Sequence, residues 1–327
     1  MSVKILLGPS FPEEEIRPLR EHAEVLPLSD MGDGDLDAAL PEIDCLLVHF
    51  WPERLDVARV SRMTRLSLVQ TGLAGVNHIP FGALNKTAVV CSNAGGFSDE
   101  VGEHAWGLLL SAGKRVVKFD AAMRKEGYKP APALELGRDI LVLKGRTLGI
   151  IGYGSIGKKV AELGRAFGMN VMEFSRRKAG DPGIVSLRGR SGFEKVLRES
   201  DAAVIALPLT KSTRGMIGEK ELSMMKREAI LVNIARAEIV DEAAIYSHLA
   251  ANRRFTYATD VWWMKEGKES YAPELPFLKL ENFIGTPHVS GPSAAVTSAP
   301  QRRAVKNVLR FLRGEELLNV VDRSEYA

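Results

Sequence analysis

Short hydrophobic runs alternate with polar, helix-compatible stretches from the first residues of the chain. Polar segments such as PEEEIRPLREH, residues 12–22, separate these runs. Alternation on this scale predicts βαβ units around a mostly parallel sheet. The strands predicted in this first series are residues 3–7, 23–28, 45–50, 66–71 and 88–93.

The pattern changes at Ser98. Residues 98–127 contain no proline, carry acidic residues in the first turn and keep apolar residues on one face. With Ser98 as a helix N-cap, this stretch predicts a long helix that begins a second domain. A loop rich in proline and alanine, YKPAPALELGRD, follows it.

A second series of strands follows, and the last predicted helix, at 292–313, can return to pack on the first domain. The chain of 327 residues exceeds the size at which a single core usually stops growing. We therefore predict an α/β protein with two Rossmann-like or flavodoxin-like parallel-sheet domains and a cleft between them. The strands predicted in the second series are residues 147–154, 170–175, 202–208, 229–235, 255–261 and 282–287.

Composition and net charge limit the classes of binding partner that we expect. Hydrophobic residues make up 45% of the chain, charged residues make up 26%, and the formal net charge of +3 is spread along the sequence. Because no basic stripe or arm is present, a nucleic-acid partner is not expected. No run approaches the ~20 apolar residues of a membrane span, and the start does not match a signal peptide, so we expect a cytoplasmic protein with no membrane partner. Cys45 and Cys91 lie in apolar runs and predict buried thiols, with no metal site expected.

The segment LGIIGYGSIGKKVAELG carries Gly152, Gly154 and Gly157 in G-x-G-x-x-G spacing. An apolar strand precedes the motif and an amphipathic helix follows it, which is the context of a dinucleotide site. Gly152 serves the tight turn, Gly154 allows close approach of a pyrophosphate, and Gly157 lets the helix pack on the strand. Backbone N–H groups at the helix start then face the negative charge.

The segment EFSRRK bears on the choice of cofactor. Ser175 stands at the tip of the next predicted strand, where an acid usually accepts hydrogen bonds from the adenosine ribose. A serine can donate to a 2′-phosphate, and Arg176 and Arg177 offer planar cationic groups for it. We therefore expect NADP(H) to be preferred over NAD(H). The alternatives are that RRK is only a solvated turn, and that Glu173 is the acid at the strand tip if the strand ends two residues earlier.

Three further segments accompany the glycine motif: LVNIARAEIVDEAAI, TDVWWMKEG and GTPHVSG. Together they resemble the D-isomer-specific 2-hydroxyacid dehydrogenases, and in character the glyoxylate and hydroxypyruvate reductases among them. The resemblance covers nearly the whole chain, including LAGVNHI, SDEVGEHAWGLLL and ALPLTKSTRGMI. It implies a hydride transfer between a nicotinamide cofactor and a small 2-oxo or 2-hydroxy acid.

Reduction of a 2-oxo acid needs a cation for the carboxylate and a proton donor beside the carbonyl oxygen. By resemblance, Arg236 is the cation and His288, in TPH, is the general acid. Leu73, Ala74 and Gly75 match positions that bind the substrate carboxylate.

In the family a glutamate pairs with the catalytic histidine. Relatives commonly carry it five residues after the aspartate of the DV dipeptide, where this chain has Lys265. We expect the following Glu266 to take the role, with Glu269 or no acid as alternatives.

The resemblance also implies further contacts to the cofactor, by Arg236, His288 and residues at other strand and helix ends. These are Ser155, Ile156, Leu207, Pro208, Thr213, Ile234, Ala235, Asp260, Ser290 and Gly291.

The predicted division assigns residues 98–287 to the dinucleotide-binding domain, and residues 1–97 with 288–327 to the substrate domain. The resemblance implies a homodimer through residues 98–140. The predicted reaction is NADPH-dependent reduction of a small 2-oxo acid such as glyoxylate or hydroxypyruvate to the D-2-hydroxy acid. A reductase of D-lactate type or for bulky 2-oxo acids, and a non-catalytic NAD(P)-sensing corepressor, are the alternatives.

Overall fold

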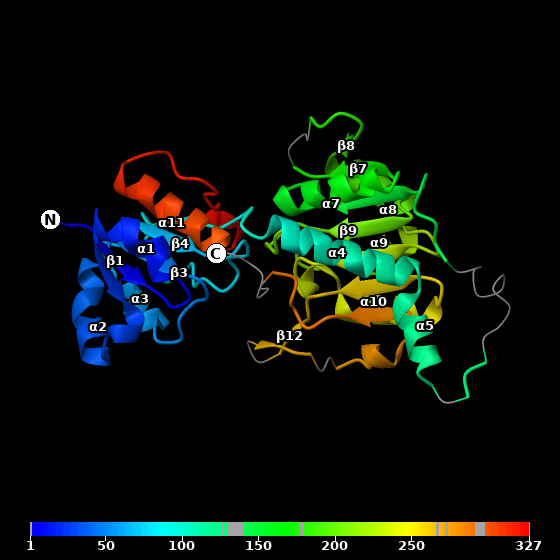
Figure 1. Ribbon diagram of the computed structural model, residues 1–327, viewed down its shortest axis with the longest axis horizontal. Helices are drawn as coiled ribbons and strands as arrows, with labels where there is room; N and C mark the ends of the chain where they lie inside the picture. Colours follow the sequence, from blue (N-terminus) through cyan, green and yellow to red (C-terminus); the bar gives the residue numbers. More distant parts are fainter. Residues whose placement is uncertain are drawn as a thin grey trace. The chain divides into compact units, whose positions relative to one another are not determined.

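The computed structural model describes residues 2–125, 127–129, 140–176, 180–265, 268–271, 274–291 and 298–326. Two compact units divide the chain (Figure 1). The first unit comprises Met1–Phe97 with Ala294–Ala327, and the second comprises Ser98–Ser293. Each contains its own parallel sheet, which confirms the predicted α/β class with two parallel-sheet domains.

The first unit has a five-stranded parallel sheet of order β2-β1-β3-β4-β5, the flavodoxin-like order. Side chains alternate between its two faces, so that Leu6 and Leu46 pack in one buried cluster while Ile5 and Leu47 pack in the other. The strands are β1 (Lys4–Leu7), β2 (Glu24–Pro27), β3 (Cys45–Val48), β4 (Leu68–Thr71) and β5 (Val89–Cys91). The helices are α1 (Glu13–Arg20), α2 (Asp33–Ala39), α3 (Val57–Ser61) and α11 (Ala299–Leu312).

The last helix, α11, belongs to this first unit although it is distant in sequence. In Figure 1 it lies beside α1, and it also contacts β3 and β4. Arg302 of α11 donates hydrogen bonds to the buried carboxylate of Glu15 in α1, the two shortest at 2.7 and 2.9 Å. Cys45 and Cys91 are buried free thiols, as the sequence predicts.

The second unit has a seven-stranded parallel sheet of order β14-β11-β10-β9-β6-β7-β8. The strand order reverses between β6 and β9, as in a Rossmann domain. The strands are β6 (Thr147–Ile151), β7 (Asn170–Phe174), β8 (Val185–Leu187), β9 (Ala202–Ile205), β10 (Ile230–Asn233), β11 (Thr256–Thr259) and β14 (Phe283–Gly285). A separate antiparallel hairpin joins β12 (Met264–Lys265) to β13 (Lys268–Glu269).

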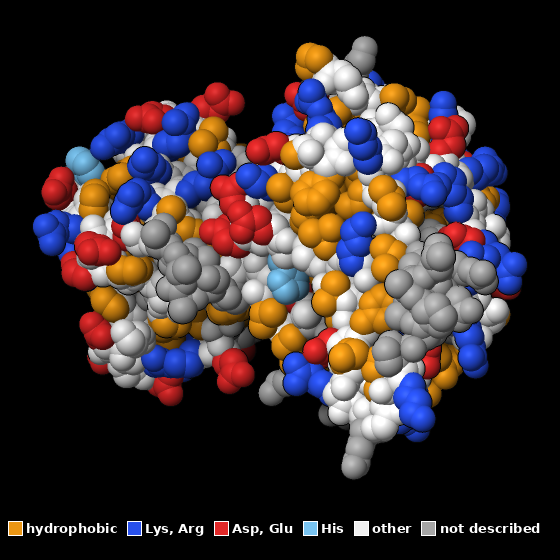
Figure 2. All heavy atoms as spheres, turned by 45° about the vertical axis from the view of Figure 1, so that its right-hand side comes forward, with side chains coloured by type: hydrophobic (Ala, Val, Ile, Leu, Met, Phe, Trp, Pro, Cys, Tyr) orange, Lys and Arg blue, Asp and Glu red, His pale blue; other side chains and the backbone are white. Residues whose placement is uncertain are grey.

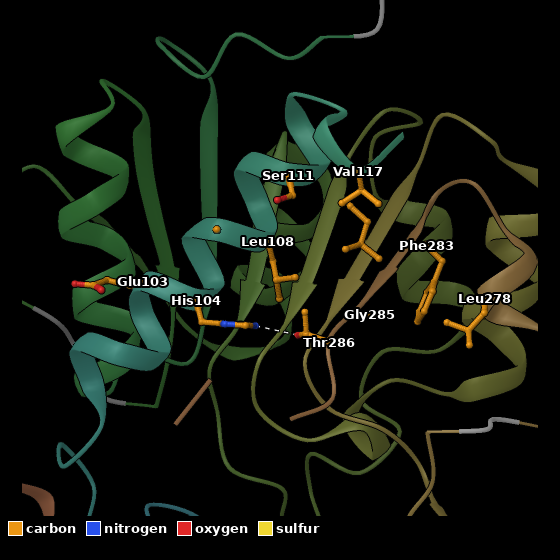
Figure 3. A pocket seen from close by; sticks show the side chains of 11 residues that line it. Glu103, His104, Leu108, Ser111, Val117, Leu278, Phe283, Gly285 and Thr286 are labelled. Atoms are coloured by element: carbon orange, nitrogen blue, oxygen red, sulfur yellow. Dashed lines mark hydrogen bonds between the residues drawn. The ribbon is translucent and has the colours of Figure 1, made fainter. Parts of the chain in front are cut away.

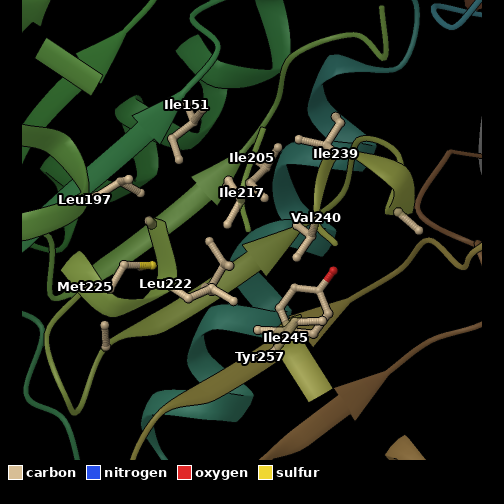
Figure 4. Close-up of a cluster of buried hydrophobic side chains, with 14 of the residues drawn as sticks. Ile151, Leu197, Ile205, Ile217, Leu222, Met225, Ile239, Val240, Ile245 and Tyr257 are labelled. Carbon is tan, nitrogen blue, oxygen red and sulfur yellow. The ribbon is translucent and has the colours of Figure 1, made fainter. Parts of the chain in front are cut away.

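Helices cover both faces of this sheet. On one face α8, α9 and α10 enclose a cluster of buried side chains that includes Ile151, Leu222 and Tyr257 (Figure 4). On the other, α4 packs beside α7 and against β10 and β11. The helices are α4 (Ser98–Gly113), α5 (Val116–Met123), α7 (Ser155–Ala166), α8 (Gly189–Glu199), α9 (Glu219–Met224) and α10 (Glu242–Ala251).

The predicted helix over 98–127 is in fact two helices. It breaks at Arg115, whose φ of 55° lies in the left-handed region that ends a helix. The returning chain supports the break, because the Leu141 N–H donates to the Gly113 carbonyl at 2.8 Å and the Lys114 ammonium donates to the Leu141 carbonyl at 2.8 Å.

The observed boundary before α11 also differs from the predicted one. The described residues 288–291, predicted to belong to the first unit, fall in the second. The physical reason is that the backbone N–H groups of Val289 and Ser290 donate to the carboxylate of Asp260, which follows β11 in that unit.

Candidate active site

The carboxyl edge of the seven-stranded sheet gathers most of the predicted site residues. In an open α/β sheet, ligands bind outside the carboxyl ends of the strands, where the strand order reverses. Here that point lies between β6 and β9. The glycine loop follows β6, Leu207 follows β9, and Arg236 follows β10. Their common position follows from the parallel register of the sheet.

The glycine loop has the shape that a dinucleotide requires. Gly152 has a φ of 103°, and a Cβ there would lie 2.6 Å from the backbone nitrogen of Leu207. A Cβ at Gly157 would lie 2.2 Å from the Gly152 carbonyl oxygen, so glycine lets α7 pack against the turn. By contrast, a Cβ at Gly154 would meet nothing within 4 Å. The open space at Gly154, beside the first N–H groups of α7, fits a pyrophosphate.

Two tyrosines near these strand ends remain neutral. Burial, followed by a hydrogen bond to Asp181, raises the pKa of the Tyr153 phenol in the glycine loop. Burial also raises the pKa of Tyr257 to about 12, and this hydroxyl accepts a hydrogen bond from Asn233 at 3.2 Å. Asn233 is thereby fixed at the end of β10, where its side chain also donates to the Arg236 carbonyl at 3.0 Å.

Strand β7 ends at Phe174, so Ser175, the first of the residues predicted to select the cofactor, follows it directly. The Ser175 N–H donates to the Leu187 carbonyl of β8 at 3.4 Å. Glu173 is fully buried within the strand, and one of its oxygens accepts a hydrogen bond from Ser186. Glu173 therefore does not occupy the strand tip. Arg177 lies outside the described residues.

Arg236 is half-buried and adopts an extended conformation immediately before a 3-10 turn. Its guanidinium Nη1 donates to the Ala235 carbonyl at 2.6 Å. The other residues predicted after β9 and β10 are Leu207, Pro208, Ile234 and Ala235, and Thr213 donates to the Pro208 carbonyl at 2.7 Å. These contacts hold the loops after two adjacent strands at the sheet edge.

Asp260, fully buried after β11, organises the loop that follows β14. Its Oδ1 accepts hydrogen bonds from the Thr286 hydroxyl at 2.6 Å and the Val289 N–H at 3.0 Å. Its Oδ2 accepts from the Ser290 N–H at 2.8 Å. His288, between these anchors, has a φ of 52°. A residue of this size rarely takes that conformation unless its surroundings fix it, and here the donors on both sides bind one carboxylate.

His288 pairs with an acid from the β12–β13 hairpin. Its Nδ1 lies 2.6 Å from Oε2 of Glu269, and Oε1 of Glu269 accepts the Trp262 backbone N–H at 2.6 Å. The imidazole is partly exposed, with 36% of its side-chain surface accessible, whereas Glu269 is 20% accessible. Glu266, the partner predicted from the sequence, lies outside the described residues, and its role stays a prediction.

The position of Glu269 depends on the hairpin and on Trp262. Glu269 is opposite Met264 in the hairpin register. The Trp262 indole N–H donates to the Thr286 carbonyl at 2.8 Å, which ties the start of the hairpin to the loop of His288. Counting from the DV dipeptide misses this arrangement, although the KEGKE sequence contains both candidate glutamates.

The predicted carboxylate-binding segment, Leu73, Ala74 and Gly75, follows β4 at the carboxyl edge of the first unit's sheet. The Leu73 N–H donates to the Thr71 hydroxyl at 3.1 Å, and its carbonyl accepts from the Asn93 N–H at 2.8 Å. Within the first unit, Leu73 is therefore held at both its backbone N–H and its backbone carbonyl.

Among the described residues, no cluster of three or more His, Cys, Asp or Glu side chains has the arrangement of a metal site. No helix there is both long enough and apolar enough to cross a membrane.

Comparisons of this chain with family models, curated proteins and solved structures agree with one another. The model of the NAD binding domain of D-isomer specific 2-hydroxyacid dehydrogenases matches residues 106–290. A glyoxylate reductase of Korarchaeum cryptofilum is 30% identical, over 99% of this chain and 97% of that protein. One from Aeropyrum pernix is 34% identical, over 83% and 81%. A solved structure from Pyrococcus horikoshii OT3 is 25% identical, with a TM-score of 0.82, and covers 98% of this chain and 96% of that one.

The family match spans the glycine loop, Arg236, the hairpin and His288, which the fold brings to one edge of the sheet. The chain therefore belongs to the D-isomer specific 2-hydroxyacid dehydrogenases and is an NAD(P)-dependent oxidoreductase.

Proposed function

We propose that this enzyme reduces a small 2-oxo acid of the glyoxylate or hydroxypyruvate type to the corresponding 2-hydroxy acid, with NADPH as the preferred reductant. The observation that carries the proposal is the contact of 2.6 Å between His288 and Glu269, at the sheet edge that also holds Arg236. Full-length similarity to glyoxylate reductases supports the substrate class.

His288 is the proton donor in this proposal. An ionised Glu269 can only accept a hydrogen bond, so Nδ1 of His288 carries the proton of this contact. Nε2 is then the ring nitrogen that gives a proton to the carbonyl oxygen of the substrate. The negative charge of Glu269 stabilises the protonated imidazole. Because the Trp262 N–H fixes the position of this carboxylate, Glu269 also orients the ring.

Arg236 is the cation that binds the substrate carboxylate and polarises the carbonyl. A planar guanidinium suits this role because it can donate two parallel hydrogen bonds to a carboxylate. Its contact to the Ala235 carbonyl limits the directions that the side chain can take. The amides of Ala74 and Gly75, with Leu73, are proposed as further carboxylate ligands.

The bound nicotinamide cofactor supplies the hydride. Gly152, Gly154 and Gly157 form its pyrophosphate site with the N–H groups of Ser155 and Ile156. Asp260 and the loop of His288 lie at the same edge of the sheet and are proposed to hold the nicotinamide. The further proposed contacts are Leu207, Pro208, Thr213, Ile234, Ala235, Arg236, Ser290 and Gly291.

The preference for NADPH rests on the residues after β7. A serine and two arginines follow this strand, and Glu173 is buried inside it. A 2′-phosphate at this point would meet donors and positive charge, whereas an acid would repel it. The proposal assigns the phosphate to Ser175, Arg176 and Arg177.

A homodimer through residues 98–140 is part of the proposal. In α5 none of the residues is buried, and Val116, Val117 and Met123 are 54%, 50% and 66% exposed. Figure 2 shows hydrophobic side chains on the surface of the second unit in this view. Apolar surface on a helix of this kind is typical of an interface between protein chains.

The test is the initial rate of NADPH and NADH oxidation with glyoxylate, hydroxypyruvate, pyruvate and phenylpyruvate, for the wild type and for His288→Ala. We expect turnover of the small acids with NADPH and its loss in the variant. Faster turnover of pyruvate or phenylpyruvate would replace the proposed substrate with a D-lactate-type or bulky one. Absence of turnover on all four acids, with partner proteins captured only when nucleotide is bound, would favour a corepressor.

A further inference from the structure

A pocket of about 620 Å³ on the second unit is lined in part by His104 and Thr286, whose side chains contact each other. Thr286 lies two residues before His288 in the same loop. Figure 3 shows His104 reaching from α4 toward Thr286, at the end of β14. Nε2 of His104 lies 2.9 Å from the Thr286 hydroxyl and 3.5 Å from Oδ1 of Asp260. The rest of the pocket is largely apolar, and includes Leu108, Leu278 and Phe283.

The direction of these hydrogen bonds follows from the chemistry of the groups. The Thr286 hydroxyl has one hydrogen and donates it to Asp260 at 2.6 Å, since an ionised carboxylate can only accept. The contact of 2.9 Å to His104 therefore uses a lone pair of the hydroxyl, so Nε2 of His104 carries the hydrogen. The bonds run in one direction, from His104 through Thr286 to Asp260.

This series of bonds ends on the group that fixes the backbone around His288. Asp260 is fully buried and also binds the N–H groups of Val289 and Ser290, directly after His288. On the other side, the His288 N–H donates to the Thr286 carbonyl at 3.0 Å. Thr286 and Asp260 thus hold the loop on both sides of a histidine whose φ is 52°.

We propose that His104 is a positioning residue for the reaction: by donating to Thr286, it holds Thr286 and Asp260 in the arrangement that aims His288 at the substrate. This rests on the proposed role of His288. Nothing in the proton transfer requires His104 to touch the substrate or cofactor. Its effect passes through the backbone geometry of residues 286–290.

Four variants test the hydrogen bonds that link His104, Thr286 and Asp260. His104→Ala removes the donor, whereas His104→Gln places an amide N–H near the position of Nε2 and restores it. Thr286→Val keeps the shape of the side chain but breaks both bonds. Glu103→Gln, on the same turn of α4, is the control because Glu103 is exposed and lines the pocket without taking part in this series of bonds.

The first readout is steady-state kinetics with glyoxylate and NADPH. We expect His104→Ala to lower kcat by about 10- to 100-fold, since a displacement of order 1 Å can cost about 100-fold, with a smaller change in KM. His104→Gln should recover most of the loss, and Glu103→Gln should match the wild type. His104→Ala combined with Thr286→Val should lose no more than Thr286→Val alone, because both act on one series of bonds.

The second readout needs no turnover. In His104→Ala, hydrogen exchange should be about tenfold faster at the Val289 and Ser290 amides, which is the size of effect expected from losing the hydrogen bond between His104 and Thr286. Exchange in the strands of the sheet should be unchanged. A kcat close to wild type in His104→Ala, equal losses in the Ala and Gln variants, or unchanged exchange at these two amides would overturn the inference. If the wild type reduces no 2-oxo acid, the proposed function fails, and the exchange measurement still decides the role of His104.

Discussion

Nδ1 of His288 lies 2.6 Å from Oε2 of Glu269, although 18 residues, including strand β14, separate the two positions in the chain. The other oxygen of Glu269 accepts the Trp262 N–H, so the carboxylate is held at both ends. This arrangement leaves Nε2 of His288 available for proton transfer and makes Glu269 the acid to test first.

Replacing Glu269 with Gln should lower kcat for glyoxylate reduction by about 100-fold or more, within the range that general acid catalysis contributes. The amide still fills the site but does not stabilise the protonated imidazole. The matched variant is Glu266→Gln, which we expect to stay near the wild-type rate. If Glu266→Gln is instead the slow variant, the assignment of Glu269 is wrong and the prediction from sequence is right.

Changing Ser175 to Asp should reverse the cofactor preference. A carboxylate at the strand tip repels the 2′-phosphate and accepts hydrogen bonds from the ribose hydroxyls. We expect kcat/KM for NADPH to fall by about 10- to 100-fold, the effect of losing a charge-assisted bond, while the value for NADH rises. The measurement is the ratio of kcat/KM for the two cofactors, and an unchanged ratio would exclude Ser175 from the phosphate site.

Gly152→Ala and Gly154→Ala should separate folding from cofactor binding. At Gly152 the φ of 103° and the backbone of Leu207 at 2.6 Å make any Cβ costly, so we expect a loss of about 2 kcal/mol or more in unfolding free energy. At Gly154 a Cβ meets nothing within 4 Å. That variant should keep the thermal stability of the wild type and lose affinity for NADPH, as measured by fluorescence titration. Equal melting temperatures for the two variants would contradict this account.

The buried carboxylate of Glu15 should make the first unit sensitive to acid. Hydrogen bonds from Arg302 and then Ser298 hold the pKa of Glu15 below its ordinary value of 4.5. A lowered pKa stabilises the folded state above pH 4.5, and the contribution is lost as the pH falls through the folded-state pKa. Urea unfolding should therefore show Glu15→Gln to be less stable than the wild type at pH 7, with the difference shrinking toward pH 3. Glu21→Gln, exposed at the end of the same helix, is the control, and an equal difference at both pH values would contradict the prediction.

Val117→Asp should weaken the proposed dimer. Val117 is 50% exposed on α5, and an unpaired charge buried at an interface is unfavourable. Sedimentation velocity should show a shift from dimer to monomer at micromolar concentration. Val57→Asp, which changes an exposed valine of the first unit, should leave the wild-type distribution intact. A monomeric wild type, or a variant that remains dimeric, would exclude α5 from the interface.

The sequence determined the features that depend on near neighbours. Alternating hydrophobic runs predicted two parallel-sheet units because buried parallel strands read as short apolar segments. The spacing of Gly152, Gly154 and Gly157 predicted the turn because only glycine permits its φ and its close contacts. The strand β8 was missed because its three residues, VSL, carry too little pattern to separate them from a loop.

The tertiary structure decided what depends on distant contacts. Glu269 meets His288 because of the register of a hairpin and the hydrogen bond from Trp262, neither of which is encoded in a residue count. Glu173 is buried because it lies inside β7, where it pairs with β8. Residues 288–291 belong to the second unit because Asp260 binds the backbone N–H groups of Val289 and Ser290. In each case the outcome was set by contacts between residues that are not neighbours in the sequence, and the local pattern does not tell which of them pair.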